Sequence, residues 1–161
     1  MGEAVVRYDQ DFIGWTEQQA RVLQEAAAHG SNLALDWKNL IEEVEGLGRS
    51  QYDAVASHVR RVMVHLLKLE FSPAGGPKAS WRESVRDARA DIEGRLQRDS
   101  GLKPRLAEMI GSEAPRATKL EASAMCDYGE GAEAVMARLR GADAYTMDQI
   151  LGDWLPGDGG P

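Results

Sequence analysis

Residues 36–71 form the longest segment of this chain with unbroken helical periodicity, and they are also its most apolar part. The second half of the segment repeats apolar residues in steps of four and three, the spacing of one helix face. These residues are Val55, Val59, Val62, Leu66 and Leu69. A helix with such a stripe, and with further apolar side chains beside it, is normally buried in a bundle. We therefore predict an all-α fold, a helical bundle of four to five main helices around a central helix at about residues 50–71, with short C-terminal helices.

The same segment leaves open whether it forms one helix or two. Asp36 is placed to cap its start. Gly46 and Gly48 each weaken a helix by about 1 kcal/mol relative to alanine. Ser50 and Asp53 then have the spacing of a weak capping box. These features favour a break or a kink near Gly48, although the apolar spacing runs on through it and is also compatible with a continuous helix.

An amphipathic helix precedes the central segment, and either Asp9 or Asp11 can cap it. Its expected inner face is aromatic at the start and steps by four and three: Tyr8, Phe12, Trp15, Gln19, Val22 and Ala26. We interpret this face as packing against the central segment rather than as an aromatic ligand cage.

Capping signals and one proline divide the rest of the chain. Ser80 and Glu83 form a capping box that predicts the start of another helix, and Thr146 with Gln149 predicts a short one. Residues 132–139 indicate a further short helix. Pro115 lies inside an otherwise helical pattern and predicts a kink or a break, because proline removes a donor and clashes with the preceding turn.

Length and composition predict a single all-helical domain at residues 1–155 and a disordered tail at 156–161, which is rich in glycine and proline. A net charge of −7 argues against general binding to nucleic acid or anionic membranes. The single Cys126 excludes an internal disulfide and fits a reducing cytoplasm. We expect no signal peptide and no membrane span.

The best candidate for chemistry is a polar cluster of glutamates, histidines and one arginine: Glu42, Glu43, Glu45, His58, His65 and Arg89. The two histidines are seven residues apart, about 10.5 Å along a helix, which is too far to share one metal ion. The chain also lacks the Glu-x-x-His pairs of bundle di-metal proteins. We favour a structural role, with His65 at the core edge held by a polar partner and the glutamates paired with arginines of the next helix. A metal site using Glu42, Glu45 and His65 is the alternative.

A weaker candidate is an anion or nucleic-acid strip of three arginines, Arg82, Arg86 and Arg89. Interleaved acidic residues cancel much of its charge, and no stacking aromatic residues accompany it. We favour a solvated flank, or one paired with the glutamates. The sequence shows no nucleophile elbow, phosphate-binding loop or cofactor motif.

Several strings in the chain resemble a bacterial family catalogued as domain of unknown function twenty-nine. The most specific are NLIEEVEGLGRS at 39–50 and HLLK at 65–68. The segments at 8–15, 80–82, 145–146 and 155–156 match as well, whereas 111–115 and 129–144 depart from the family pattern. The resemblance implies a small all-helical bacterial protein, and it supplies no activity, cofactor or catalytic residue to carry over.

The sequence therefore favours a non-enzymatic helical interaction or accessory module of the bacterial cytoplasm. An unidentified protein partner and a homodimer are both compatible with this hypothesis, and a homodimer face could come from the aromatic first helix or from the C-terminal third. The metal-binding protein and the arginine strip remain the alternatives.

Overall fold

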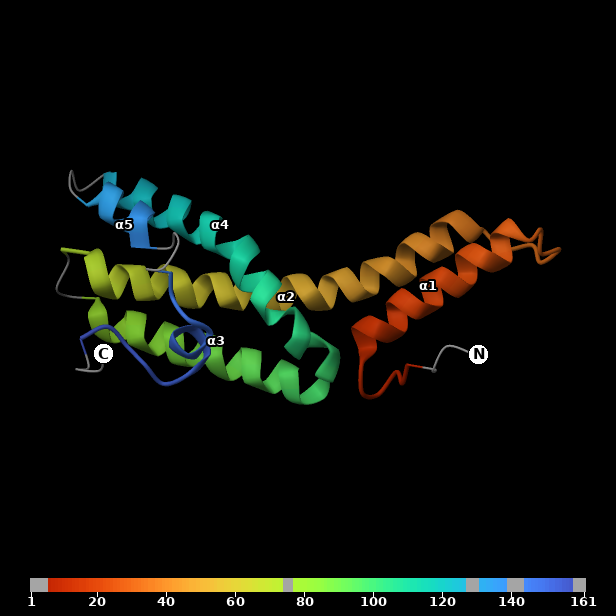
Figure 1. The fold of residues 1–161 in the computed structure, drawn as a ribbon, viewed down its shortest axis with the longest axis horizontal. Helices are drawn as coiled ribbons and strands as arrows, with labels where there is room; N and C mark the ends of the chain where they lie inside the picture. Colours follow the sequence, from red (N-terminus) through yellow and green to blue (C-terminus); the bar gives the residue numbers. More distant parts are fainter. Residues whose placement is uncertain (1–5, 74–76, 127–130, 139–143, 158–161) are drawn as a thin grey trace. The chain divides into compact units, whose positions relative to one another are not determined.

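A computed structural model describes residues 6–73, 77–126, 131–138 and 144–157, and these residues contain helices and no strand. The elements are α1 (Phe12–Ala28), α2 (Trp37–Phe71), α3 (Lys78–Arg98), the 3-10 helix η1 (Ser100–Arg105), α4 (Leu106–Cys126), α5 (Ala132–Arg138) and α6 (Met147–Leu151) (Figure 1). The predicted all-α class is confirmed.

The chain divides into two compact units. The first unit holds residues 1–54 and 94–105, and the second unit holds residues 55–93 and 106–161. The single domain expected at 1–155 stays a prediction. Most of the expected disordered tail, residues 158–161, lies outside the described residues, as does most of the turn expected at 128–131.

Helix α2 is continuous, so of the two alternatives the single helix is confirmed and a break near Gly48 is wrong, whereas a kink there stays a prediction (Figure 1). Asp36 starts the helix as predicted, because its Oδ1 accepts the Asn39 N–H at 3.2 Å. Gly48 is buried, and a Cβ there would collide with Thr16 Oγ1. The glycine therefore allows α1 and α2 to approach closely, and this packing offsets its low helix propensity.

The predicted core stripe of the second unit is confirmed. Its members are all buried: Val55, Val59, Val62, Leu66 and Leu69. The other helices of this unit add buried apolar residues, among them Val85, Ile92, Met109, Val135 and Ile150. Burying a side chain of this size contributes about 1.5–3 kcal/mol, so this unit has a core of its own.

Helix α4 includes Pro115 without interruption, so the break predicted there is wrong, and the alternative of a kink stays a prediction. Glu113 is 3% exposed, and its carboxylate accepts from Arg60 at 2.9 Å and from Arg116 at 2.8 Å. These ion pairs tie the turn before the proline to α2 and to the turn after it. Such ties stabilise a helix that lacks one backbone donor.

The first unit is built around the antiparallel pairing of α1 with residues 37–54 of α2. Thr16 faces Gly48, and Gln24 Nε2 donates to Glu45 Oε1 at 3.2 Å. Asp11 caps α1 as predicted, with its Oδ1 accepting the Gly14 N–H at 2.7 Å. We refer to this pair of helices as the hairpin.

Two residues after α3 join the start of α1 to the rest of the first unit. Asp99 Oδ1 accepts the Phe12 N–H at 3.2 Å, so the helix start has a second carboxylate cap. The Ser100 backbone N–H and hydroxyl both donate to the Gln10 carbonyl, at 2.8 and 2.6 Å. Both carboxylates lie at the helix N-terminus, where negative charge is stabilised.

Two predicted helix starts have different outcomes. Helix α3 begins at Lys78, ahead of the box predicted at Ser80 and Glu83, because Pro77 suits a first helical turn and its carbonyl accepts the Trp81 N–H at 3.0 Å. The box at Thr146 and Gln149 is confirmed, with both reciprocal hydrogen bonds present.

Candidate functional site

The structure separates the predicted polar cluster by unit. Glu42, Glu43 and Glu45 belong to the first unit, whereas His58, His65 and Arg89 belong to the second. Glu42 and Glu43 are exposed, and Glu45 lies 3.5 Å from Arg49 in an ion pair. Within the described residues, no three His, Cys, Asp or Glu side chains are grouped so that they could hold a metal ion.

The two histidines of α2 have different surroundings. His58 Nδ1 lies 3.5 Å from Asp91 Oδ2. His65 is half-buried, and its buried Nδ1 has no hydrogen-bond partner among the described residues, so the predicted polar partner is wrong. Burial, helped by the charges of Lys68 and Arg61, lowers the pKa of His65 to about 4. Its imidazole is therefore neutral at neutral pH.

Arg89 is used for structure rather than for a strip on the surface. Its guanidinium donates to the backbone carbonyls of Ile150 at 2.9 Å, Gln149 at 2.6 Å and Trp154 at 2.8 Å. It thereby fastens α6 and the segment after it to α3, and its predicted pairing with the glutamates is wrong. Burial lowers the pKa of Arg89, although the charge of Asp153 opposes that shift. Arg86 is exposed, and Arg82 is half-buried.

The predicted inner face of α1 is only partly buried. The residues that α1 buries are Ile13, Gly14, Thr16, Gln18 and Ala20, whereas Tyr8 is 60% exposed and Val22 is 52% exposed. Tyr8, Phe12 and Trp15 form an aromatic cluster, with the Tyr8 ring edge-on to the other two at centroid distances of 5.3 and 4.9 Å. Because Phe12 and Trp15 are only half-buried, this cluster reaches the surface.

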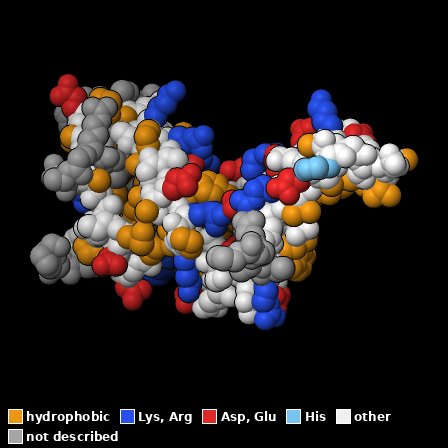
Figure 2. Space-filling view, turned by 45° about the vertical axis from the view of Figure 1, so that its right-hand side comes forward, with side chains coloured by type: hydrophobic (Ala, Val, Ile, Leu, Met, Phe, Trp, Pro, Cys, Tyr) orange, Lys and Arg blue, Asp and Glu red, His pale blue; other side chains and the backbone are white. Residues whose placement is uncertain are grey.

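Helix α2 also presents an apolar stripe in the first unit. Leu40 is 37% exposed and Leu47 is 51% exposed, and two leucines of the connection to α1, Leu33 and Leu35, are 65% and 46% exposed. Figure 2 shows hydrophobic side chains in orange along one edge of the hairpin, at the right of the view. The same helix pair therefore leaves apolar side chains uncovered on both of its members.

The two stripes lie on the same side of the hairpin. At about 100° per residue, Phe12, Trp15 and Val22 lie about a third of a turn from the side of α1 that meets α2. Leu40 and Leu47 lie about a quarter of a turn from the side of α2 that meets α1. Since the helices are antiparallel, these two rotations point the stripes the same way. We call this surface the open face, formed by Tyr8, Phe12, Trp15, Val22, Leu40 and Leu47.

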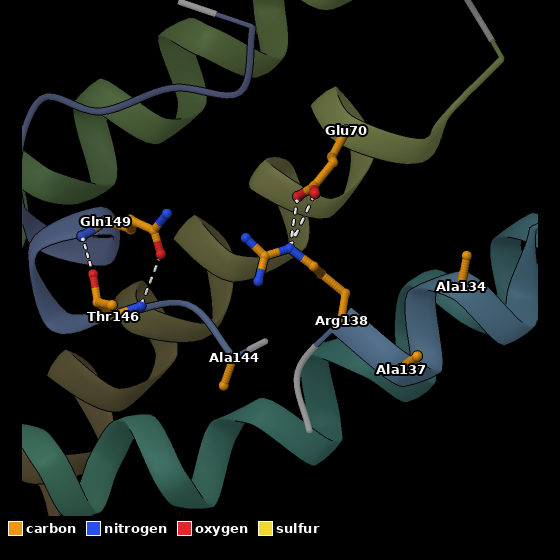
Figure 3. Close-up of a pocket in the computed structure, with 7 residues that line it drawn as sticks. All are labelled: Glu70, Ala134, Ala137, Arg138, Ala144, Thr146 and Gln149. Carbon is orange, nitrogen blue, oxygen red and sulfur yellow. Dashed lines mark hydrogen bonds and ion pairs between the residues drawn. The ribbon is translucent and has the colours of Figure 1, made fainter. Parts of the chain in front are cut away.

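A shallow pocket of about 650 Å³, widely open to solvent, lies in the second unit, and we refer to it as the cavity. Three alanines and four polar residues line it: Ala134, Ala137, Ala144, Glu70, Arg138, Thr146 and Gln149 (Figure 3). The residues come from the end of α2, from α5, and from α6 with the segment before it. A volume of this size is typical of small-molecule sites.

Glu70 organises one wall of this cavity. Arg138 Nε donates to both of its oxygens, at 3.0 and 3.2 Å, and the Tyr145 hydroxyl donates to it at 2.6 Å. The Arg138 guanidinium also lies over the Tyr145 ring, 4.1 Å from its centroid. Burial and the hydrogen bond to Glu70 raise the pKa of Tyr145, which keeps its hydroxyl protonated as a donor.

The sequence signals for these residues were partial. Thr146 and Gln149 were visible as a capping box, and Tyr145 was among the residues of the family resemblance. Glu70 and Arg138 are 68 positions apart, and no local spacing predicts such a pairing. The open face did appear as an apolar stripe, but periodicity cannot tell whether another element covers it.

Comparisons with known proteins agree with this architecture. The family model described as Domain of unknown function DUF29 matches residues 7–155. None of the curated proteins matches the chain. A solved structure, an alpha-helical protein of unknown function from Rhodospirillum rubrum, is similar with a TM-score of 0.67 and 21% sequence identity, over 91% of this chain and 90% of that one. That likeness supports the all-helical fold, and the family match over nearly the whole length shows that the chain belongs to the DUF29 family.

Proposed function

We propose that this protein is a helical interaction module whose open face binds one amphipathic helix of a partner protein, with lysine or arginine beside the partner's apolar stripe. The single observation that carries the proposal is the pair of exposed apolar stripes on one side of the hairpin. Two helices can cover only part of each other's apolar surface, and a third helix laid along them completes a small bundle. Amphipathic helices are commonly recognised in apolar grooves of this kind.

Charge favours a cationic partner. Residues 12–53 carry seven acidic and three basic side chains, a net charge of −4. By the helical geometry used above, Lys38 and Arg49 point away from the open face, whereas Glu43 lies beside Leu40 and Leu47. A basic helix would therefore meet complementary charge, while a second copy of the hairpin would bring like charges together.

The size of the open face also favours a single helix. Its side chains, with those of Leu33 and Leu35, leave on the order of 500 Å² of apolar surface uncovered, within the range at which patches on monomers are often functional. A standard protein–protein interface buries about 800 Å² on each partner. The uncovered area of the open face therefore matches a single bound helix better than a face-to-face dimer.

A designed peptide tests the proposal. The probe is a fluorescent 20-residue helix with leucine on one face and lysine on the other, titrated at 0.15 M salt and followed by anisotropy. We expect saturable binding that Val22→Asp and Leu47→Asp each weaken at least tenfold. Leu120→Asp is the matched control, because Leu120 is 56% exposed but lies in the second unit, and it should change the affinity less than twofold.

Three outcomes would overturn the proposal. The first is equal binding of the peptide by the wild type and both hairpin variants. The second is equally tight binding of a peptide with glutamate in place of lysine. The third is a dimer in sedimentation experiments that Leu47→Asp dissociates, which would identify a second copy as the occupant.

We further propose that the module acts in the bacterial cytoplasm, supported by the single Cys126. No helix of the described part of the chain is both long and apolar enough to cross a membrane.

A further inference from the structure

We infer that the cavity beside Glu70 is a binding site for a small monocarboxylate with a short apolar tail, held by Arg138 and Gln149. This site lies in the second unit and is independent of the open face. The Arg138 guanidinium is held in place before any ligand arrives.

The Arg138 guanidinium is held by a hydrogen bond at one edge and by an aromatic ring against one of its faces. Its Nε is bound to Glu70, and the Tyr145 ring lies beneath the guanidinium at 4.1 Å. The Arg138 side chain is 18% exposed, so it is largely packed but still reachable from solvent. An arginine held in this way loses little conformational freedom when a ligand binds it.

The two terminal nitrogens of Arg138 remain available. In the described residues neither has a hydrogen-bond partner, and Figure 3 shows both on the side of the guanidinium turned away from Glu70. Gln149 Oε1 accepts the Thr146 N–H at 2.9 Å, which leaves its Nε2 as a free donor within the described structure. The polar groups left for a ligand are therefore donors.

The carboxylate of Glu70, the acceptor on this wall of the cavity, already accepts hydrogen bonds from the protein. Glu70 receives hydrogen bonds from Arg138 and from Tyr145. A ligand must therefore bring its own acceptor oxygens, and a planar carboxylate matches the fork of two guanidinium N–H groups. Since Glu70 balances the charge of Arg138, a singly charged carboxylate fits better than a phosphate dianion, which would be repelled by the nearby carboxylate.

The rest of the lining selects the tail of the ligand. Among the described residues, the rest of the lining consists of Ala134, Ala137 and Ala144, whose side chains are methyl groups. A short aliphatic chain would contact the apolar part of this lining, and burying its CH₂ groups favours binding. The proposed ligand class is therefore a short-chain aliphatic carboxylate.

Titration with sodium butyrate tests this site. Binding is followed by NMR up to 100 mM ligand at constant ionic strength, with butylammonium chloride and inorganic phosphate as comparison ligands. We expect saturable shifts for butyrate that are confined to residues lining the cavity. Arg138→Lys keeps the charge but removes the fork, so it should raise the dissociation constant at least tenfold.

A second variant separates binding from folding. Gln149→Glu retains an acceptor for the Thr146 N–H and preserves the capping box, but it replaces the donor Nε2 with a carboxylate oxygen. We expect unchanged thermal stability at pH 7 together with at least a tenfold loss of butyrate affinity. Arg86→Lys on the exposed side of α3 is the matched control and should leave the affinity unchanged.

The inference is overturned if butyrate gives no saturable shift, if phosphate or butylammonium binds more tightly than butyrate, or if Gln149→Glu binds butyrate as well as the wild type does.

Discussion

The two units bury their apolar side chains very differently. Among the described residues, the second unit holds nineteen of the buried hydrophobic residues, and the first unit holds three, namely Ile13, Ala20 and Leu102. The exposed large hydrophobic residues show the reverse, with six in the first unit and three in the second. Helices with apolar stripes nevertheless occur in both units. The difference therefore lies in what covers the stripes and not in whether they exist.

This contrast indicates a division of roles. The second unit has the buried core that a stable domain needs. The hairpin of the first unit is held by caps, a close helix contact and an ion pair between Arg105 and Glu17 at 2.8 Å, while much of its apolar surface stays exposed. Surfaces of this kind are usually functional, because exposed apolar patches also carry a risk of aggregation.

Truncating one leucine in each unit should reveal the contrast in burial as a large difference in stability. Leu66 is fully buried in the second unit, and Leu66→Ala should lower the free energy of unfolding by about 2–5 kcal/mol through lost burial and a cavity. Leu47 is 51% exposed, and Leu47→Ala should change it by less than about 0.5 kcal/mol. Urea denaturation measures both. Similar losses would mean that the hairpin stripe is covered in solution.

The hydrogen bonds from Arg89 to three backbone carbonyls should make the second largest contribution to stability. Arg89→Ala removes donors from three carbonyls, and we expect a loss of about 2–3 kcal/mol, because hydrogen bonds from a charged group to partly buried acceptors are strong. Arg86→Ala, the exposed neighbour one turn earlier, should cost less than about 0.5 kcal/mol. Thermal unfolding of the two variants distinguishes the loss of these hydrogen bonds from a general effect of removing an arginine from α3. Equal losses would contradict the assigned role.

Alanine substitutions at two glycines of α2 test how closely the two helices of the hairpin pack. Gly48→Ala would collide with Thr16 Oγ1 and should destabilise by about 1–3 kcal/mol. At Gly46 the nearest atom to an added Cβ is an Arg49 nitrogen 4.0 Å away, so Gly46→Ala should stabilise by up to about 1 kcal/mol. Chemical denaturation measures both changes.

The double variant Thr16→Ala with Gly48→Ala supplies the control for this pair, because removing Oγ1 should restore much of the lost stability. A stabilising Gly48→Ala on its own would show that the two helices do not pack at this point.

The mildest test uses pH. His65 has a folded pKa of about 4 and an unfolded pKa of about 6.5. Between these values the unfolded chain binds the proton and the folded chain does not, so this residue lowers stability as pH falls below 6.5. Because His65 is only half-buried, solvent screening limits the effect to about 1 kcal/mol or less.

Urea denaturation of the wild type and His65→Asn at pH 7 and pH 5 measures this effect. The wild type should lose more stability than the variant between the two values. An identical pH dependence in both proteins would contradict the shifted pKa.

The sequence predicted the fold well where burial and local pattern agree. The stripe from Val55 to Leu69, the cap at Asp11 and the box at Thr146 all depend on spacing within one helix, and each is confirmed. Neither Gly48 nor Pro115 interrupts its helix, because contacts from other helices, made by Thr16 and Arg60, outweigh local propensity. The partners of Arg89 and Glu70 could not be predicted, since both residues bind groups sixty or more positions away.

The continuity of α2 has a consequence for amide exchange. One helix passes from turns with exposed side chains near Leu40 and Leu47 to turns that are wholly enclosed near Val62 and Leu66. Deuterium uptake should therefore be graded along a single element, fast at its amino end and slow in its second half, with no loop to mark the transition. If adding another molecule slows amide exchange between residues 37 and 47, that molecule binds to the amino-terminal half of α2.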